Sequence, residues 1–135
     1  MMDDVLHHHL FRSRVERRAD RQGRNLLPVP ALQNDGPERM LVKTRWVSLC
    51  GSDIPLFTGN KRHIDYPLPP GAPIHESVGE VVTSQSNHFR PGDQVLAIPE
   101  GDQGLAEYFV AQAVKAIRLP PELEGCDDSC LIQPF

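Results

Sequence analysis

Three residues of the chain have the side-chain types that hold a catalytic zinc ion. Cys50 comes directly after a segment rich in β-forming residues, and His75 and Glu76 are neighbours just before another such segment. A catalytic zinc takes three protein ligands from Cys, His and acidic residues and leaves a fourth position for water or substrate. Without paired ligands, however, the residue types alone favour structural roles: Cys50 as a buried thiol, His75 as a loop histidine and Glu76 as a surface carboxylate. Ser52-Asp53 would then cap a short helix.

The elements that must hold these side chains are short strands. Turn signals such as Arg90-Pro91-Gly92-Asp93 separate segments rich in β-forming residues, a pattern typical of a β-barrel or a sandwich. In the strand expected at residues 41–49, Val42, Thr44 and Trp46 should lie on one face, because side chains alternate along a strand. A single helical turn is expected within residues 52–59. The expected strands are residues 41–49, 78–84, 94–98, 106–112 and 115–119.

Composition restricts the class of protein. The 135 residues fit one domain, and the 39% hydrophobic share with 10 Gly is close to that of soluble globular proteins. The 13 Pro favour short strands and turns over long helices. A net charge of −4 argues against a nucleic-acid partner, and no apolar run approaches the roughly 20 residues that span a membrane. Without a secretory signal, we expect a cytoplasmic protein with no membrane partner.

The first 25 residues differ from the rest. Six arginines lie between Arg12 and Arg24 with two acidic residues among them, and apolar residues recur at spacings of four. This pattern predicts a basic N-terminal arm, helical or disordered, ahead of a domain that spans residues 26–135. The adjacent His7, His8 and His9 would point in different directions on a helix, so they are not taken as a metal site. The odd number of cysteines, with Cys126 and Cys130 apart from Cys50, argues against a disulfide framework.

Five segments together resemble one known family. They are VSLCGSD (47–53), HESVGEVV (75–82), RPGDQVLAIP (90–99), LAEYFV (105–110) and LPPEL (119–123). In this order and spacing they resemble the N-terminal, GroES-like catalytic domain of the medium-chain zinc-dependent alcohol, polyol and threonine dehydrogenases. The resemblance covers residues 28–135. It implies a mainly β fold, a partly open β-barrel with short helices, which carries a catalytic zinc.

The resemblance also implies roles for single residues. Cys50 and His75 would be direct zinc ligands, and Glu76 a direct or switching ligand. Ser52 matches the hydroxyl that takes the proton of the alcohol, and Asp53 matches a carboxylate that orients the ligand histidine. These roles agree with general chemistry, because zinc polarises a bound oxygen and a carboxylate on the far ring nitrogen fixes the histidine tautomer.

Several positions depart from the family pattern. Ile74 stands where the family has the Gly of Gly-His-Glu, and Pro55 stands about where many members have a relay histidine. Gln133 replaces the acidic residue of a Glu-Pro pair that often completes the zinc site. The four-cysteine structural zinc lobe is missing, since no Cys lies between Pro99 and Gly104. We therefore expect one catalytic zinc, with a weakened fourth position, and no structural zinc.

The family's nucleotide-binding half is a Rossmann domain with a Gly-rich turn, and the chain contains no G-x-G. That half is expected to be absent, so the chain alone is expected to be inactive. Completed by such a half, the domain would support hydride transfer between a small alcohol or polyol and NAD or NADP. The alternative is a truncated, non-catalytic GroES-like module for binding or assembly. Loss of the second half would expose apolar surface within residues 131–135, so a homo-oligomer is expected.

Overall fold

The computed structural model describes residues 36–60, 65–126, 128 and 129. All of them belong to one compact unit, Leu32–Phe135. The expected basic arm at residues 1–25, its three histidines, Cys130 and Gln133 lie outside the described residues.

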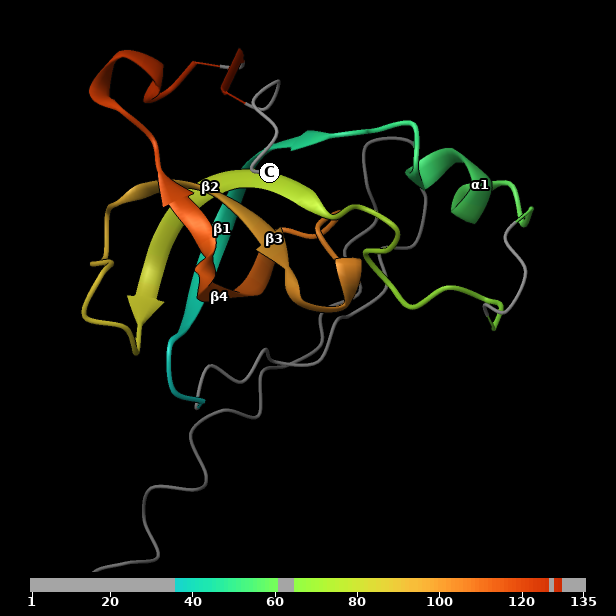
Figure 1. Ribbon diagram of the computed structural model, residues 1–135, viewed down its shortest axis with the longest axis horizontal. Coiled ribbons are helices and arrows are strands. Elements are labelled where there is room, and N and C mark those ends of the chain that lie inside the picture. The colour runs from blue at the N-terminus through green and yellow to red at the C-terminus, as the bar shows by residue number, and fades with distance from the viewer. Residues whose placement is uncertain (1–35, 61–64, 127, 130–135) are drawn as a thin grey trace, which may run out of the picture. The chain divides into compact units, whose positions relative to one another are not determined.

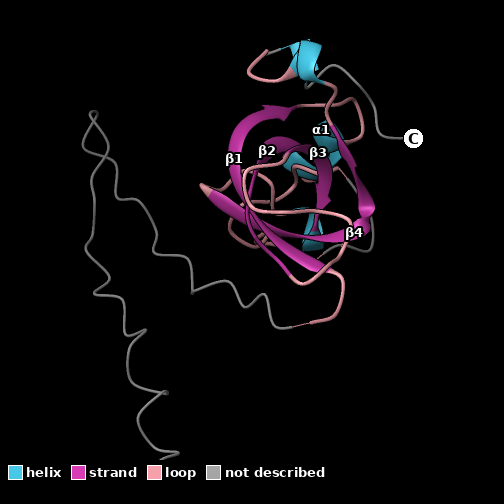
Figure 2. Cartoon of the chain, turned by 90° about the vertical axis from the view of Figure 1, so that its left-hand side faces the viewer, coloured by secondary structure: helices cyan, strands magenta, loops and turns pink. Residues whose placement is uncertain are grey.

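Four antiparallel strands form the frame of the domain (Figure 1). They are β1 (Arg39–Ser48), β2 (Glu76–Ser84), β3 (Gln94–Pro99) and β4 (Tyr108–Arg118). β2 pairs with β1 and β3, and β4 pairs with the same two strands on their other sides. Each strand therefore has two neighbours, and the sheet closes into a ring (Figure 2). The mainly β barrel predicted from the sequence is confirmed.

One long strand replaces two predicted short ones. The sequence predicted separate strands at residues 106–112 and 115–119, whereas β4 runs without interruption from Tyr108 to Arg118. Its first part pairs with β1 and its last part with β3, and the register against β3 shifts between Ala97 and Pro99. The predicted gap thus coincides with an irregularity in pairing. The Ala113 N–H donates to the Glu38 carbonyl at 2.8 Å, so backbone bonding continues through it.

The barrel interior is filled by alternate residues of the strands. Phe109 is the largest of them, and full burial of such a side chain stabilises a fold by about 1.5–3 kcal/mol. β3 buries consecutive residues, because Val95 and Ala97 face this cluster while Leu96 joins a second one with Val78 and Leu119. The interior cluster consists of Met40, Val42, Val81, Phe89, Val95, Ala97, Phe109, Ala111 and Ala113.

Close approach of β1 and β2 depends on Gly79. A Cβ atom at this position would overlap with the carbonyl oxygen of Lys43 and lie 2.6 Å from Cγ1 of Val42. Glycine is therefore the residue that lets the two backbones pair here.

In the described part of the chain, three short helices lie outside the strands, two of them between strands and one after β4. They are α1 (Asp53–Phe57), between β1 and β2, and the 3₁₀ turns η1 (Glu100–Asp102) and η2 (Pro121–Leu123). The helical turn expected within residues 52–59 is α1. Among the described residues, no helix combines the length and the apolar character needed to cross a membrane.

Candidate metal centre

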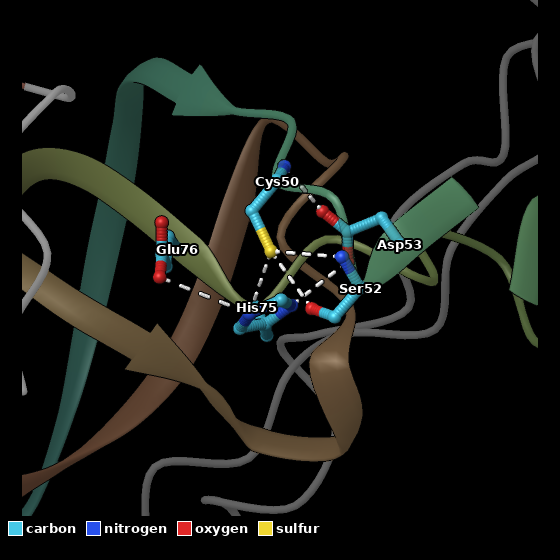
Figure 3. A network of polar contacts seen from close by, with 5 residues as sticks. All are labelled: Cys50, Ser52, Asp53, His75 and Glu76. Atoms are coloured by element: carbon cyan, nitrogen blue, oxygen red, sulfur yellow. Dashed lines mark hydrogen bonds and ion pairs between the residues drawn. The ribbon is translucent and has the colours of Figure 1, made fainter. Parts of the chain in front are cut away.

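The candidate site lies where β1 ends, α1 begins and β2 starts (Figure 3). Ser48 at the end of β1 pairs with Glu76 at the start of β2. Cys50 and His75 lie just beyond this last pair, one on each side. The pairing of β1 and β2 therefore brings together two residues that are far apart in sequence.

A tight turn fixes Cys50 relative to α1. The Asp53 N–H donates to the Cys50 carbonyl at 3.1 Å, and the Cys50 N–H donates to Oδ2 of Asp53 at 2.9 Å. The two bonds close the turn from both ends. Asp53 is completely buried, so its carboxylate is held among fixed partners rather than in water.

The second oxygen of this carboxylate orients His75. Oδ1 of Asp53 lies 2.8 Å from Nδ1 of His75. With the proton on Nδ1 donated to Asp53, Nε2 of the neutral ring is free of a proton and has an available lone pair. Nε2 faces Cys50, whose Sγ lies 3.6 Å away. The histidine thus presents this nitrogen to the thiol.

Hydrogen bonds around the sulfur favour the thiolate form of Cys50. Oγ of Ser52 lies 2.7 Å from Sγ, and the Ser52 N–H donates to Sγ at 3.3 Å. These two bonds, first the side-chain one, lower the pKa of Cys50 below its usual value, and the nearby His75 adds to the effect. Burial and the charge of Asp53 oppose the shift but do not reverse it.

The pKa of His75 is shifted in the opposite direction. Burial acts to lower it, but the hydrogen bond and the charge of Asp53, with smaller contributions from Cys50 and Glu76, outweigh burial and raise the pKa. In the metal-free protein, both shifts favour a thiolate beside a protonated imidazole. Zinc binding requires the thiolate and displaces the proton from the ring nitrogen.

Glu76 lies beside the His75 ring. Its side chain is almost completely buried, and Oε1 lies 3.8 Å from Nε2 of His75. The charge of Glu76 therefore faces the same space as the sulfur and the ring nitrogen. Figure 3 shows dashed lines from both the sulfur of Cys50 and the carboxylate of Glu76 to the His75 ring.

The sulfur of Cys50 and the ring nitrogen of His75 fit zinc in kind and in spacing. Tetrahedral zinc with a sulfur ligand at about 2.3 Å and a nitrogen ligand at about 2.0–2.1 Å holds these two atoms roughly 3.5 Å apart. The separation of Cys50 Sγ and His75 Nε2 is 3.6 Å. The potential ligands whose atoms lie within 4.8 Å of one another are Cys50, Asp53 and His75, and Glu76 is not in this group. Both oxygens of Asp53, however, already bind Cys50 and His75, which suits an orienting carboxylate.

The structure thus brings together the five predicted site residues, Cys50, Ser52, Asp53, His75 and Glu76, in one contact network. Of the positions that depart from the family pattern, Pro55 lies within α1 and Ile74 is buried.

One residue near the site was not identified from the sequence. The Gly104 N–H donates to the carbonyl of Ile74, which precedes His75, at 2.9 Å. The available signal was a glycine directly before the LAEYFV segment, but its partner is 30 positions away and only the fold shows the contact.

Comparisons with known proteins agree with the fold. The family model described as "Alcohol dehydrogenase GroES-like domain" matches residues 36–121. The chain is 33% identical over 109 residues to the chloroplastic quinone-oxidoreductase QR1 of Triphysaria versicolor. This alignment covers 78% of this chain and 32% of that protein. It is 39% identical over 67 residues to the probable cinnamyl alcohol dehydrogenase 1 of Eucalyptus gunnii. This second alignment covers 48% of this chain and 18% of that protein.

Among solved structures, galactitol-1-phosphate dehydrogenase from Escherichia coli superposes with a TM-score of 0.63 at 24% identity. The match covers 80% of this chain and 38% of that one, and it shows the GroES-like fold. In the alignments with the two curated relatives, the chain spans about a third or less of the length of each relative.

Proposed function

Because the chain belongs to the family of alcohol dehydrogenase GroES-like domains, we propose that it is the zinc-holding catalytic domain of an oxidoreductase. The reaction is hydride transfer between an alcohol or polyol and NAD or NADP. A second, nucleotide-binding domain supplies the dinucleotide. The observation that carries the proposal is the separation of 3.6 Å between Cys50 Sγ and His75 Nε2, with Asp53 on the far side of the ring.

In this proposal Cys50, His75 and Glu76 hold the ion. A soft sulfur, an imidazole nitrogen and a carboxylate oxygen form a donor set that catalytic zinc accepts, and three protein ligands leave one position open. When bound, zinc supplies Lewis-acid polarisation of the substrate oxygen. The negative charges of Cys50 and Glu76 offset the charge of the ion.

Ser52 and Asp53 act on the proton and on the ligand geometry. The Ser52 side chain is exposed and its Oγ lies 2.7 Å from the sulfur, so an alcohol that approaches the site meets this hydroxyl. The hydroxyl accepts the alcohol proton while its own proton passes to solvent. Pro55 offers no titratable group, so this transfer uses water directly. In the neutral ring, Asp53 fixes the proton on Nδ1 of His75, so Nε2 is the nitrogen that would coordinate the ion.

The proposal is tested by the metal content of the purified chain after growth with zinc and removal of loosely bound ions. We expect one zinc per chain, lost in Cys50→Ser. The matched control is Cys126→Ser, because Cys126 is also a half-buried free cysteine and its recorded contacts are made by its backbone.

Cobalt provides a second measurement, because a cobalt–thiolate bond absorbs in the near ultraviolet. This absorption is expected in the wild type and in Cys126→Ser, and to disappear in Cys50→Ser. A wild-type chain that binds neither ion at saturating concentration would refute the zinc site and favour a non-catalytic binding module. Addition of a primary alcohol or a polyol to the cobalt form is expected to shift its visible spectrum, since the open position is where substrate binds.

A further inference from the structure

We propose that Gly104 is a positioning residue for His75 and Glu76, and that it acts through the backbone segment on either side of them. The inference rests on the proposed function only in that it takes His75 and Glu76 as zinc ligands. Among the described residues, the neighbours of Gly104 are Ile74 and Ser77 rather than the two ligand side chains. Its effect is on where the ligand-bearing backbone lies.

The first contact is made with the residue before His75. Gly104 is buried, and its N–H donates to the Ile74 carbonyl at 2.9 Å. A Cβ atom at position 104 would lie 2.9 Å from this same carbonyl oxygen and 2.9 Å from Cγ2 of Ile74. The backbone of Gly104 is not in the left-handed region. Glycine is therefore required here for space and not for conformation.

The second contact is made with the residue after Glu76. A Cβ atom at position 104 would overlap with Oγ of Ser77, which is fully buried and has no hydrogen-bond partner among the described residues. Gly104 thus lies against Ile74 and Ser77, the residues on either side of the His75-Glu76 pair. A group added at Gly104 therefore presses on the Ile74 carbonyl at one end of the pair and on the Ser77 side chain at the other.

A neighbouring hydrogen bond fixes the start of the segment that leads to His75. The Leu105 N–H donates to the Gly71 carbonyl at 2.8 Å. Gly71 has φ of +90°, and a Cβ atom there would lie 2.9 Å from the Gln103 carbonyl oxygen. Residues 103–105 therefore hold the approach to His75 at two points, Gly71 and Ile74.

Ile74 makes this arrangement particular to the present chain. The family resemblance leads one to expect glycine at position 74, whereas this chain has a β-branched side chain that is 4% exposed. Its Cγ2 packs toward the space left by the missing side chain of Gly104. The position of the Ile74 side chain therefore depends on the absence of a side chain at Gly104. Because Ile74 precedes His75, the position of His75 depends on Gly104 as well.

The expected loss of metal affinity in Gly104→Ala follows from how small a displacement of its ligands a metal site tolerates. Ordinary van der Waals contact to a Cβ atom begins near 3.4 Å, so contacts at 2.9 Å require a shift of several tenths of an ångström. Functional sites must be held to within about 0.5 Å of the productive geometry. Changes to the groups that hold metal ligands typically lower metal affinity by about 10- to 100-fold. We expect a loss in this range for Gly104→Ala.

The experiment compares Gly104→Ala with Gly79→Ala in the full chain, by cobalt titration and zinc competition. Gly79→Ala is the control, because its Cβ atom also overlaps with a neighbouring atom, the Lys43 carbonyl oxygen, but lies against Lys43 and Val42 of β1. Both variants are expected to lose stability. Only Gly104→Ala is expected to bind metal more weakly when folded and to have an altered cobalt–thiolate absorption.

A second readout uses the metal-free protein and separates this inference from the proposed function. The Nδ1–H of His75 donates to Asp53, and ¹⁵N NMR of the histidine ring reports this bond. We expect its signal to change in Gly104→Ala and to persist in Gly79→Ala. If the wild type binds no metal, the zinc proposal fails, and the His75 signal alone decides whether Gly104 positions the ring.

Wild-type metal affinity and a wild-type His75 signal in Gly104→Ala would overturn the inference, as would equal changes in both variants. If Gly104→Ala does not fold, Ile74→Ala replaces it. This variant removes Cγ2 but keeps the carbonyl that accepts the Gly104 N–H. It is expected to weaken metal binding less than tenfold, and an unchanged affinity together with an unchanged His75 signal would contradict the proposal.

Discussion

Asp53 Oδ1 lies 2.8 Å from Nδ1 of His75, and the same carboxylate accepts the N–H of Cys50 through its other oxygen. One buried acidic residue therefore connects the two parts of the chain that form the site. The turn after β1 and the residues before β2 share this carboxylate as their common partner.

The first prediction concerns the charge of Asp53. Asp53→Asn keeps the shape of the side chain but removes the negative charge that raises the pKa of His75. The pKa of His75 is therefore expected to fall in the metal-free variant, as measured by NMR titration of the ring protons. Zinc affinity is expected to fall by about 10- to 100-fold, because the orienting carboxylate is lost. An unchanged His75 pKa would contradict the assigned hydrogen bond.

The second prediction concerns the sulfur of Cys50. Ser52→Ala removes the hydroxyl that is the largest cause of the lowered thiol pKa, while the backbone N–H of residue 52 remains. The pKa of Cys50 is expected to rise, so alkylation of the metal-free chain near neutral pH should slow. The pH dependence of the alkylation rate measures this in a Cys126→Ser, Cys130→Ser background, in which Cys50 is the one cysteine left in the sequence. A pH profile identical to that of the parent would show that the hydroxyl does not stabilise the thiolate.

The third prediction compares two buried serines. Ser77 Oγ has no partner among the described residues, whereas Ser86 Oγ donates to Glu38 at 2.5 Å and accepts the His88 N–H at 3.2 Å. An unpaired buried hydroxyl costs stability, so Ser77→Ala is expected to leave the free energy of unfolding unchanged or raise it by up to about 2 kcal/mol. Ser86→Ala is expected to lower it by roughly 1–3 kcal/mol. Urea unfolding of both variants provides the measurement, and a larger loss for Ser77→Ala would reverse the assignment.

The fourth prediction concerns stability at low pH. Burial opposes ionisation of Asp93, but the Arg90 N–H and the Arg118 guanidinium outweigh it and hold the pKa of Asp93 below its usual value. Because this pKa is lower in the folded state, the stabilisation is complete above the unfolded value of about 3.9 and is lost as pH falls through the folded value.

Asp93→Asn is therefore expected to lower the free energy of unfolding by about 1–2 kcal/mol at pH 7 and by less at pH 3. Urea unfolding at the two pH values tests this. The same loss at both would show that the charge of Asp93 does not contribute.

Much of the frame follows from local sequence patterns. The predicted strands at residues 78–84 and 94–98 fall within β2 and β3, because runs of apolar and β-branched residues end at turn residues such as Gly92. Cys50 and His75 could be proposed as partners only through the order of several family-like segments. Neither residue has a neighbour in sequence that identifies the other.

One feature of the fold depends on pairing between strands and could not be predicted locally. Val42, Thr44 and Trp46 were expected on one face, but the register of β1 against β2 shifts between Thr44 and Trp46. Val42 is fully buried while Trp46 is 43% exposed, so the expectation is wrong for Trp46. A local alternation contains no information on such a shift, since the extra residue is set by the partner strand.

Pairing of β1 with β4, from Arg39 opposite Gln112 to Lys43 opposite Tyr108, has a consequence for synthesis of the protein. Translation proceeds from the N-terminus, so the first strand of the ring leaves the ribosome long before its last partner. Until residues 108–118 have emerged, one side of β1 has no partner and Phe109 cannot fill the interior. Contacts so distant in sequence close late and fold slowly. The nascent domain therefore passes through a stage at which holdase chaperones can bind it, and β4 ends that stage.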